Sequence, residues 1–357
     1  MKKQKLLLIA LGFVFATSSA LADDKLPVKL GGFVDTYFAY DFNKPSPPDR
    51  SYATSVVRHN EFNINLAYLD AVIDSSKVRG RAALQAGTSV QANYAAEPTL
   101  GTNSGPLLSR HIQEAFAGYQ VFDKFWIDAG IYFSHIGWEN WISRDNWLYT
   151  RSVMADNSPY YQSGVRFSYE FSKMVSAQLH LINGWQNVSE TGTGKAGGVQ
   201  VRVTPINDLT VTYNNFLGTE VGQLYRFFNE VWVKYMLMKG LQVAFLFDHG
   251  MQQTAGKGSW SNWWGTGVQG RYQLLSDLAL AARLEAYSDP DQVIITTGLG
   301  HGYTAQNLSV GADVTLHKQL VWRNEVRLYR GKNSMFPNRT GTSVADFLAV
   351  TSLGLSI

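Results

Sequence analysis

Apolar and polar residues alternate one by one along most of this chain, in runs of about ten residues that are separated by breaks. In residues 125–133, for example, Phe125 and Ile127 fall on one face and Asp128 on the other. Successive side chains of a β-strand point to opposite faces of a sheet, so this period of two predicts a sheet with one apolar and one polar face. By the same rule, one face of residues 61–69 is expected to carry Phe62, Ile64, Leu66 and Tyr68.

The breaks between these runs alternate between short and long. Seven short breaks are expected at residues 74–76, 122–124, 172–173, 205–208, 239–240, 275–277 and 317–319. Eight long breaks are expected near residues 42–57, 95–108, 134–158, 186–197, 218–225, 251–262, 288–302 and 331–343. These fifteen connections join sixteen strands. An even number of antiparallel strands, with short turns at one end and long loops at the other, is typical of a transmembrane up-and-down β-barrel. The strands of a soluble β-sandwich or propeller also alternate between apolar and polar residues, so such a fold is the alternative.

The first 22 residues have the features of a secretory signal peptide. Lysines precede an apolar run from Leu6 to Ala16, and small residues follow up to Ala20-Leu21-Ala22. The apolar run is shorter than the roughly 20 residues that a helix needs to cross a bilayer. Residues 1–22 are therefore predicted to be a cleaved signal peptide, and residues 23–357 to form a barrel domain in the cell outer membrane of a Gram-negative bacterium.

Composition excludes several classes of protein. Three of the 31 basic residues and none of the 28 acidic residues lie in the predicted signal peptide, so the mature chain carries 28 of each. A neutral chain gives no argument for nucleic-acid binding. The sequence contains no cysteine, which excludes disulfides and thiolate metal sites. The mature chain also lacks a run of 18 apolar residues, which excludes a helical membrane protein.

The polar faces of the predicted strands carry many cations. Alternation assigns to these faces Lys29, Arg79, Arg81, Arg110, Arg166, Arg202, Lys234, Arg271, Arg283, Arg323 and Arg327. A basic residue that faces lipid at the bilayer midplane costs roughly 2–4 kcal/mol. Eleven of them would cost on the order of 20–40 kcal/mol, more than the ~5–15 kcal/mol that stabilises a typical domain. They must therefore face water, and a barrel of this size is wide enough to contain a channel.

Several stretches resemble one family of bacterial proteins. Residues 31–45 (GGFVDTYFAYDFNKP) and 58–68 (RHNEFNINLAY) are similar to the first two strands of the OmpL-like β-barrel porins. Residues 138–166 and 183–186 (NGWQ) resemble a later loop and strand end of that family. The likeness spans nearly the whole mature chain and implies an outer-membrane porin that passes small hydrophilic solutes, without indicating a particular solute. One departure is Ile357, because outer-membrane barrels usually end in an aromatic residue.

Residues 134–158 form the third long loop, counted from a periplasmic N-terminus. In general porins the third loop folds into the lumen, and by analogy we expect this loop to form a constriction. It carries Glu139, Arg144 and Asp145 among other charges, and a channel selects by the charges and hydrogen-bonding groups at its narrowest point. The alternative is a surface loop with ordinary solvated charges.

The polar faces and the third loop together give a set of candidate site residues. The residues expected to line the pore or its constriction are Arg79, Arg81, Arg110, Glu114, Asp128, Glu139, Arg144, Asp145, Arg166, Arg202, Arg271, Arg283, Glu285, Arg323, Glu325 and Arg327. Neighbouring opposite charges, such as Arg283 and Glu285, are either structural wall pairs or a ladder for solutes. Arginine outnumbers lysine on these faces, which is a slight indication of anion preference.

Aromatic residues gather at predicted strand ends, where the interfacial girdles of a barrel lie. The pairs Phe125-Trp126 and Trp263-Trp264 are examples. The aromatic stretch 260–264 is expected to belong to the outer girdle, with sugar stacking at a channel entrance as the alternative.

The sequence indicates transport rather than catalysis. It contains no H-E-x-x-H pair and no G-x-S-x-G elbow, and no outward Ser–His pair of a barrel phospholipase is found. No catalytic residue, metal ligand or cofactor is therefore expected. A receptor or adhesin barrel that acts through its extracellular loops is the alternative function. The expected partners are outer-membrane lipid, small hydrophilic solutes or ions, and the barrel assembly machinery. Homo-oligomers are left open, and nucleic acid is not an expected partner.

Overall fold

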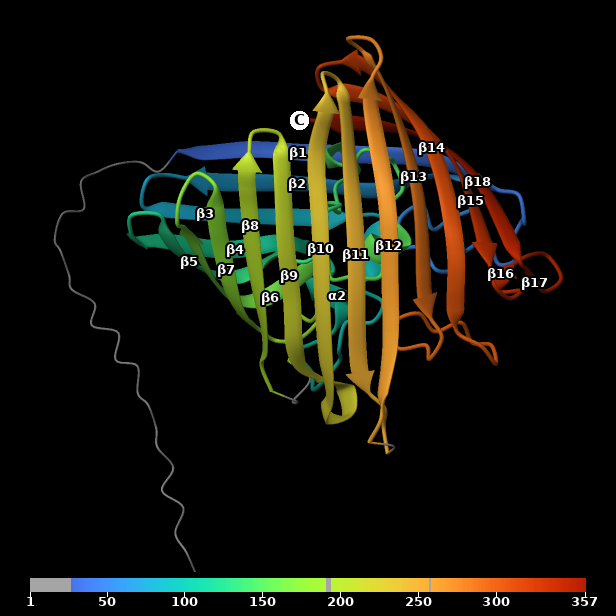
Figure 1. Ribbon diagram of the computed structural model, residues 1–357, viewed down its shortest axis with the longest axis horizontal. Helices are drawn as coiled ribbons and strands as arrows, with labels where there is room; N and C mark the ends of the chain where they lie inside the picture. Colours follow the sequence, from blue (N-terminus) through green and yellow to red (C-terminus); the bar gives the residue numbers. More distant parts are fainter. Residues whose placement is uncertain (1–26, 191–193, 257) are drawn as a thin grey trace, which may run out of the picture.

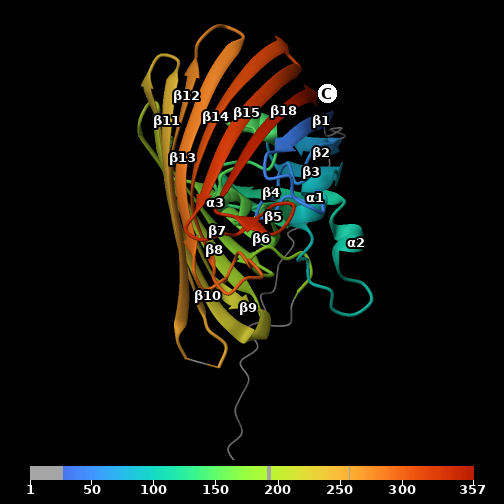
Figure 2. The same ribbon diagram turned by 90° about the vertical axis from the view of Figure 1, so that its right-hand side faces the viewer.

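The alternating runs form strands in the computed structural model, which describes residues 27–190, 194–256 and 258–357. Within these residues, sixteen antiparallel strands close into a barrel, because β1 pairs with β2 on one side and with β18 on the other (Figures 1 and 2). Each barrel strand otherwise pairs with its neighbours along the chain, so the topology is up-and-down. This confirms the predicted fold class. The predicted signal peptide, residues 1–22, lies outside the described residues.

The strands and the breaks between them follow the predicted order. The barrel strands are β1 (Val28–Asp41), β2 (Phe62–Asp74), β3 (Val78–Ala86), β4 (Ile112–Phe122), β5 (Phe125–Phe133), β6 (Tyr161–Glu170), β7 (Val175–Ile182), β8 (Ala196–Ile206), β9 (Leu209–Glu220), β10 (Leu224–Met238), β11 (Leu241–Gln253), β12 (Trp260–Gln273), β13 (Leu278–Asp289), β14 (Tyr303–His317), β15 (Leu320–Gly331) and β18 (Ala345–Ser356). A two-stranded hairpin, β16 (Phe336–Pro337) and β17 (Thr342–Ser343), lies in the last long loop. The strands β3–β7 have 8–11 residues and β8–β15 have 11–15, so one wall of the barrel is taller (Figure 1).

The helices are short and lie in the connections between strands. They are α1 (Thr88–Asn93), α2 (Pro106–Ser109), α3 (Val153–Asp156) and the 3₁₀ turns η1 (Ser143–Asp145) and η2 (Val221–Gln223). In the described part of the chain, none of the helices is both long and apolar enough to cross a membrane.

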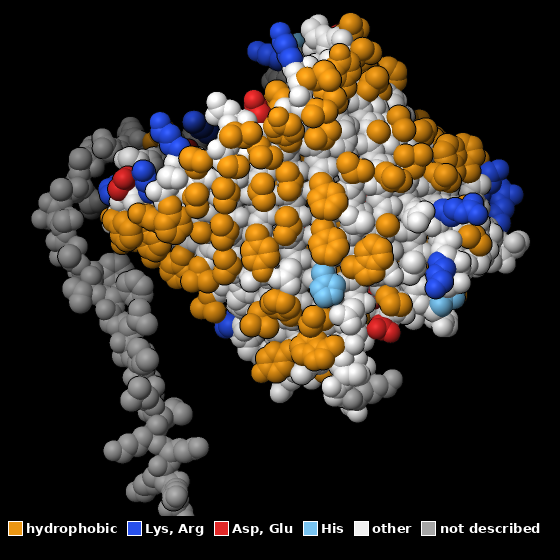
Figure 3. All heavy atoms as spheres, in the orientation of Figure 1, with side chains coloured by type: hydrophobic (Ala, Val, Ile, Leu, Met, Phe, Trp, Pro, Cys, Tyr) orange, Lys and Arg blue, Asp and Glu red, His pale blue; other side chains and the backbone are white. Residues whose placement is uncertain are grey.

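The two faces of the barrel wall differ as the alternation requires. Figure 3 shows apolar side chains spread over the outer wall, with basic side chains near its edges. On β14, Leu308 and Val310 point outward and are about half exposed, whereas the intervening Ser309 is 1% exposed. The outer face is thus suited to lipid, and the polar residues of the strands lie inside.

One predicted face is wrong. Phe62 and Ile64 point outward, but Leu66 and Tyr68 are buried inside the barrel. The β1–β2 register places Asp35 opposite Leu66 and Thr36 opposite Ile64, which leaves Asn65 as an extra residue. Such a β-bulge reverses the inward and outward positions that follow it, so a single alternation cannot describe β2.

The lipid-facing surface gives a test at two depths on one strand. Val310 lies in the middle of β14 and Leu316 near its short turn, and both are exposed on the outer face. We expect Val310→Arg to lower the free energy of unfolding by roughly 2–4 kcal/mol and Leu316→Arg by about 1 kcal/mol or less, because the cost of a charge falls toward the membrane interface. Denaturant titration in phospholipid vesicles measures both. Equal costs would contradict the placement of β14 across the bilayer.

Candidate functional site

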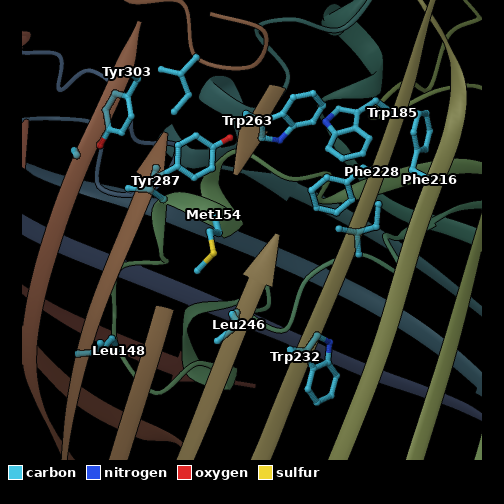
Figure 4. Close-up of a cluster of buried hydrophobic side chains, with 14 of the residues drawn as sticks. Leu148, Met154, Trp185, Phe216, Phe228, Trp232, Leu246, Trp263, Tyr287 and Tyr303 are labelled. Carbon is cyan, nitrogen blue, oxygen red and sulfur yellow. The ribbon is translucent and has the colours of Figure 1, made fainter. Parts of the chain in front are cut away.

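The connection between β5 and β6, residues 134–160, folds into the barrel; we refer to it as the inner loop. Its Ser143 and Tyr149 are at most 3% exposed. Their hydroxyl groups donate hydrogen bonds of 2.9 and 3.0 Å to the carboxylate of Asp35 on β1. Leu148 and Met154 of the same loop lie among the inward side chains of the wall (Figure 4). The loop therefore occupies part of the lumen and is not a solvated surface loop.

Arg283 on β13 binds the inner loop with both ends of its guanidinium group. Its Nη1 lies 3.0 Å from a carboxylate oxygen of Glu139, and Nη1 and Nη2 donate to the backbone carbonyls of Thr150 and Arg151 at 2.9 and 3.1 Å. The side chains of Arg283 and Glu139 are at most 1% exposed. A charge buried this deeply needs such a set of partners, because desolvation is otherwise not compensated.

Glu285 and Glu325 on the same wall continue this network. Glu285 pairs with Arg327 of β15 and accepts a hydrogen bond from the backbone N–H of Val153 at 2.8 Å. Glu325 accepts from the N–H and the hydroxyl of Thr150 at 2.7 and 2.6 Å. The anchor network, defined as Glu139, Arg283, Glu285, Glu325 and Arg327, thus ties the inner loop to β13 and β15. Of the two interpretations of these neighbouring charges, the geometry supports structural pairs.

Glycines on the wall make room for the apolar side chains of the inner loop. A Cβ atom on Gly311 would lie 2.8 Å from Leu148, and one on Gly265 would overlap the side chain of Met154. The glycines at these inward positions of β12 and β14 thus leave space for the side chains of the inner loop. The alternation of the sequence did not indicate this fit.

A buried aromatic arc lies further toward the long loops. Phe216, Phe228, Trp263, Tyr287 and Tyr303 point inward from β9, β10, β12, β13 and β14 and are at most 2% exposed (Figure 4). Trp185, from the loop between β7 and β8, packs against Phe216 and Phe228 at ring-centroid distances of 5.0 Å. The arc fills the interior beside the inner loop with apolar side chains.

The position expected for one tryptophan is wrong. Trp263 is 1% exposed and points inward, where Gly250 of β11 leaves space for its ring. Only its neighbour Trp264 points outward and is 41% exposed, as an outer girdle requires. The two belong to opposite faces because they are successive residues of one strand.

The inward arginines of the shorter strands β3 and β6 form ion pairs with carboxylates of other strands. Arg79 and Arg166 share Asp128, with nitrogen–oxygen distances of 2.6 and 2.8 Å. Arg81 pairs with Asp70 at 2.7 Å and with Glu114. These predicted inward residues of β3–β6 therefore do lie on the inner face, but as paired groups.

Two further predicted residues have different surroundings. Arg323 of β15 pairs with Asp313 at 2.8 Å and donates to the backbone carbonyl of Asn146 in the inner loop at 2.9 Å. Arg110 lies at the end of α2, outside the barrel strands, because β4 begins only at Ile112. Figure 2 shows α2 projecting beyond the strands, so the predicted wall position of Arg110 is wrong.

A polar cavity of about 470 Å³ remains between the inner loop and the inner face of β8–β10. Asp145 and Trp147 of the loop line it together with Arg202 of β8 and Lys234 of β10. Among the described residues, neither Arg202 nor Lys234 forms an ion pair, and the same holds for Arg271 on β12. Trp232, Thr204 and Thr210 also line the cavity. Sequence reasoning did not select these three, although they share the parity of Arg202 and Lys234.

Arg144 and Asp145 lie on η1, at the surface of the inner loop. Their side chains are 36% and 43% exposed, and the closest nitrogen–oxygen distance between them is 3.6 Å. Partial desolvation of the Asp145 carboxyl raises its pKa above the ordinary value, and Arg144, Arg323 and Arg81 act in the opposite direction. Within the described ranges, no group of three His, Asp or Glu side chains is close enough to hold a metal ion.

The anchor network can be tested with two arginines of the same wall. Arg283→Met leaves Glu139 and Glu285 buried without their common partner, and we expect a loss of about 3–5 kcal/mol of stability. The matched control is Arg271→Met, which removes an inward arginine that has no ion pair with the described residues and should cost less than about 1 kcal/mol. Denaturant titration measures the stability, and proteolysis of the folded barrel reports release of the inner loop. Similar losses in both variants would show that the network does not hold the loop.

The fold is shared with solved porin structures. The chain is similar to the outer membrane channel DcaP of Acinetobacter baumannii, with 13% identity, a TM-score of 0.60, and coverage of 92% of this chain and 97% of that one. It is similar to an anion-selective porin from Comamonas acidovorans, with 10% identity, a TM-score of 0.60, and coverage of 93% and 100%. A trimer form of OmpT of Vibrio cholerae matches with 11% identity, a TM-score of 0.59, and coverage of 94% and 100%. These likenesses concern the fold.

Sequence comparison identifies the family. A search of curated proteins gave no match. The profile of the family described as "Putative beta-barrel porin-2, OmpL-like" matches residues 27–357, which include every strand of the barrel. The chain therefore belongs to this family of OmpL-like outer-membrane β-barrel porins.

Proposed function

We propose that the chain forms a water-filled channel through which small hydrophilic solutes and ions diffuse passively across the outer membrane. The observation that carries the proposal is the position of the inner loop, which lies inside the barrel and leaves a polar cavity along β8–β10. In this proposal the loop is the constriction, and the cavity is part of the route taken by the solute. No catalytic step is involved.

The charged residues then have two separate roles. The anchor network is almost completely buried, so it holds the loop and does not contact solutes. Asp145, Arg202 and Lys234 line the cavity and are the groups that a passing ion meets. Arg79, Arg81, Arg166 and Arg323 contribute to the lumen wall as paired groups.

The cellular setting of the proposal follows from the family and the fold. A porin of this kind resides in the outer membrane of Gram-negative bacteria. Export through the signal peptide 1–22 and insertion by the barrel assembly machinery are part of the proposal. Association into homo-oligomers is another part, and it is supported by the trimer form of the similar OmpT.

Conductance in a planar lipid bilayer tests the channel directly. We expect stepwise, ohmic currents from the purified protein, because the cavity is polar and lined by charges. A correctly folded barrel that carries no current would contradict the proposal and would favour a receptor or adhesin that acts through its loops.

The ion preference depends on the charges at the cavity. We expect Asp145→Asn to increase the permeability of chloride relative to potassium, because it removes the acidic side chain among the residues that line the cavity. The reversal potential across a KCl gradient measures this change. Arg110→Gln is the control, since it changes a charge in the loop that contains α2 and should leave the reversal potential unchanged. An unchanged potential in Asp145→Asn would remove the cavity from the ion route.

A further inference from the structure

The cavity beside the inner loop brings together two inward cations that form no ion pair with the described residues, whereas Arg271, which shares that property, lies outside the cavity. Arg202 and Lys234 have no acidic partner within 4.0 Å in the part of the chain that the structure describes. The arginines of β3, β6 and β15 that point inward do have such partners. Two unpaired cations on one small surface repel each other, and an anion between or beside them relieves that repulsion.

An indole ring also lies next to each cation, although Trp147 and Trp232 are 8% and 7% exposed, so only a small part of each ring is open to the cavity. The guanidinium carbon of Arg202 lies 5.9 Å from the ring centroid of Trp232, and the Lys234 ammonium lies 5.8 Å from that of Trp147. Trp138 packs edge-to-face on Trp147 at 4.8 Å and extends the indole surface of the inner loop. An inorganic anion needs only the charges, whereas indole faces next to the charges suit an anion that has an apolar, planar body.

The wall offers hydrogen-bonding groups in the same place. Thr204 and Thr210 line the cavity, and Thr210 lies directly opposite Lys234 in the β9–β10 register. The row that contains Arg202 continues through Thr212 to Trp232. The Thr212 hydroxyl and the Trp232 indole nitrogen are buried and have no partner within the described residues. Both groups are inaccessible to solvent, so the wall hydroxyls that a solute in the cavity can reach are those of Thr204 and Thr210.

The single acidic group at the cavity does not cancel this character. Asp145 lies on the loop side and is close to Arg144, which compensates part of its charge. Among the residues that line the cavity, two cations thus stand against one partly compensated carboxylate, since the nearby Glu230 of β10 is buried and bound by Asn214 and the N–H of Gly137. Its volume of about 470 Å³ lies within the roughly 300–1,000 Å³ of pockets that bind small organic molecules.

We infer that this cavity is a solute-binding site for small organic anions with a planar apolar group, of the class of aromatic monocarboxylates. Arg202 and Lys234 bind the carboxylate, and Trp147 and Trp232 contact the planar body. The inference rests on the proposed channel function, since it names the class of solute that the constriction retains in passage.

Benzoate is the probe, with acetate and benzyl alcohol as the matched compounds that lack the ring and the charge, respectively. In planar bilayers we expect benzoate to reduce or interrupt the single-channel current in a concentration-dependent way, more strongly than either matched compound. Arg202→Gln and Lys234→Gln should each weaken this block by about tenfold or more, as the loss of a charged hydrogen-bond donor predicts. Arg271→Gln is the control, because Arg271 is also inward and has no ion pair in the described part of the chain, but does not line the cavity.

Calorimetry with folded protein in detergent separates this inference from the proposed function. If benzoate binds and binding is lost in Arg202→Gln and Lys234→Gln, but the protein carries no current, the binding site stands and the channel function is wrong. If the protein conducts but benzoate neither blocks better than acetate nor releases heat, the channel function stands and the binding site is wrong. An equal effect of Arg271→Gln would also overturn the inference, since it would show that any inward cation suffices.

Discussion

Ionised side chains cannot face the hydrocarbon of a membrane, and most of the structure follows from this constraint. The barrel turns its charged residues inward, where they need either water or partners. On β13 and β15 they find partners in the inner loop. Arg283 binds Glu139 together with two backbone carbonyls of the loop, and Glu325 binds Thr150. By folding into the lumen, the inner loop thus supplies ion-pair and hydrogen-bond partners to charged side chains that cannot lie on the outer wall.

The strands were predictable because their signal is local. A period of two and the breaks between runs depend on neighbouring residues only, and the sixteen barrel strands lie where the pattern placed them. Predicted faces are wrong where a single residue interrupts the strand alternation while the sequence pattern of apolar and polar residues continues. Asn65 adds a residue to β2, so Leu66 and Tyr68 turn inward although the apolar alternation continues through them. For Arg110, alternation was extended beyond the point where the strand begins.

The partners inside the barrel were not predictable in the same way. Alternation gives the face on which a side chain lies, but not the group that it meets across the lumen. Glu139 and Arg283 are 144 residues apart in the chain, and nothing local indicates that they touch. For the same reason, alternation could not distinguish Arg283, which is buried in an ion network, from Arg202, which faces an open cavity. That distinction is what separates structural charges from those that a solute can contact.

The two walls of the barrel therefore perform different tasks with the same kind of residue. The anchor network ties the inner loop to β13 and β15, and hydrogen bonds from Gln200 to His135 and from Gly137 to Glu230 tie the start of the loop to β8 and β10. A solute beside Arg202 and Lys234 therefore does not have to break an ion pair of the anchor network. The mature chain has as many acidic as basic residues, yet the ion pairs between them are unevenly distributed among the strands. Carboxylates of β2, β4, β5, β13 and β14 are bound by arginines, while Arg202 and Lys234 have no carboxylate of the described residues within 4.0 Å. A balanced overall charge can thus produce a positive route through the barrel, because the charge that a solute meets is set by pairing and not by composition.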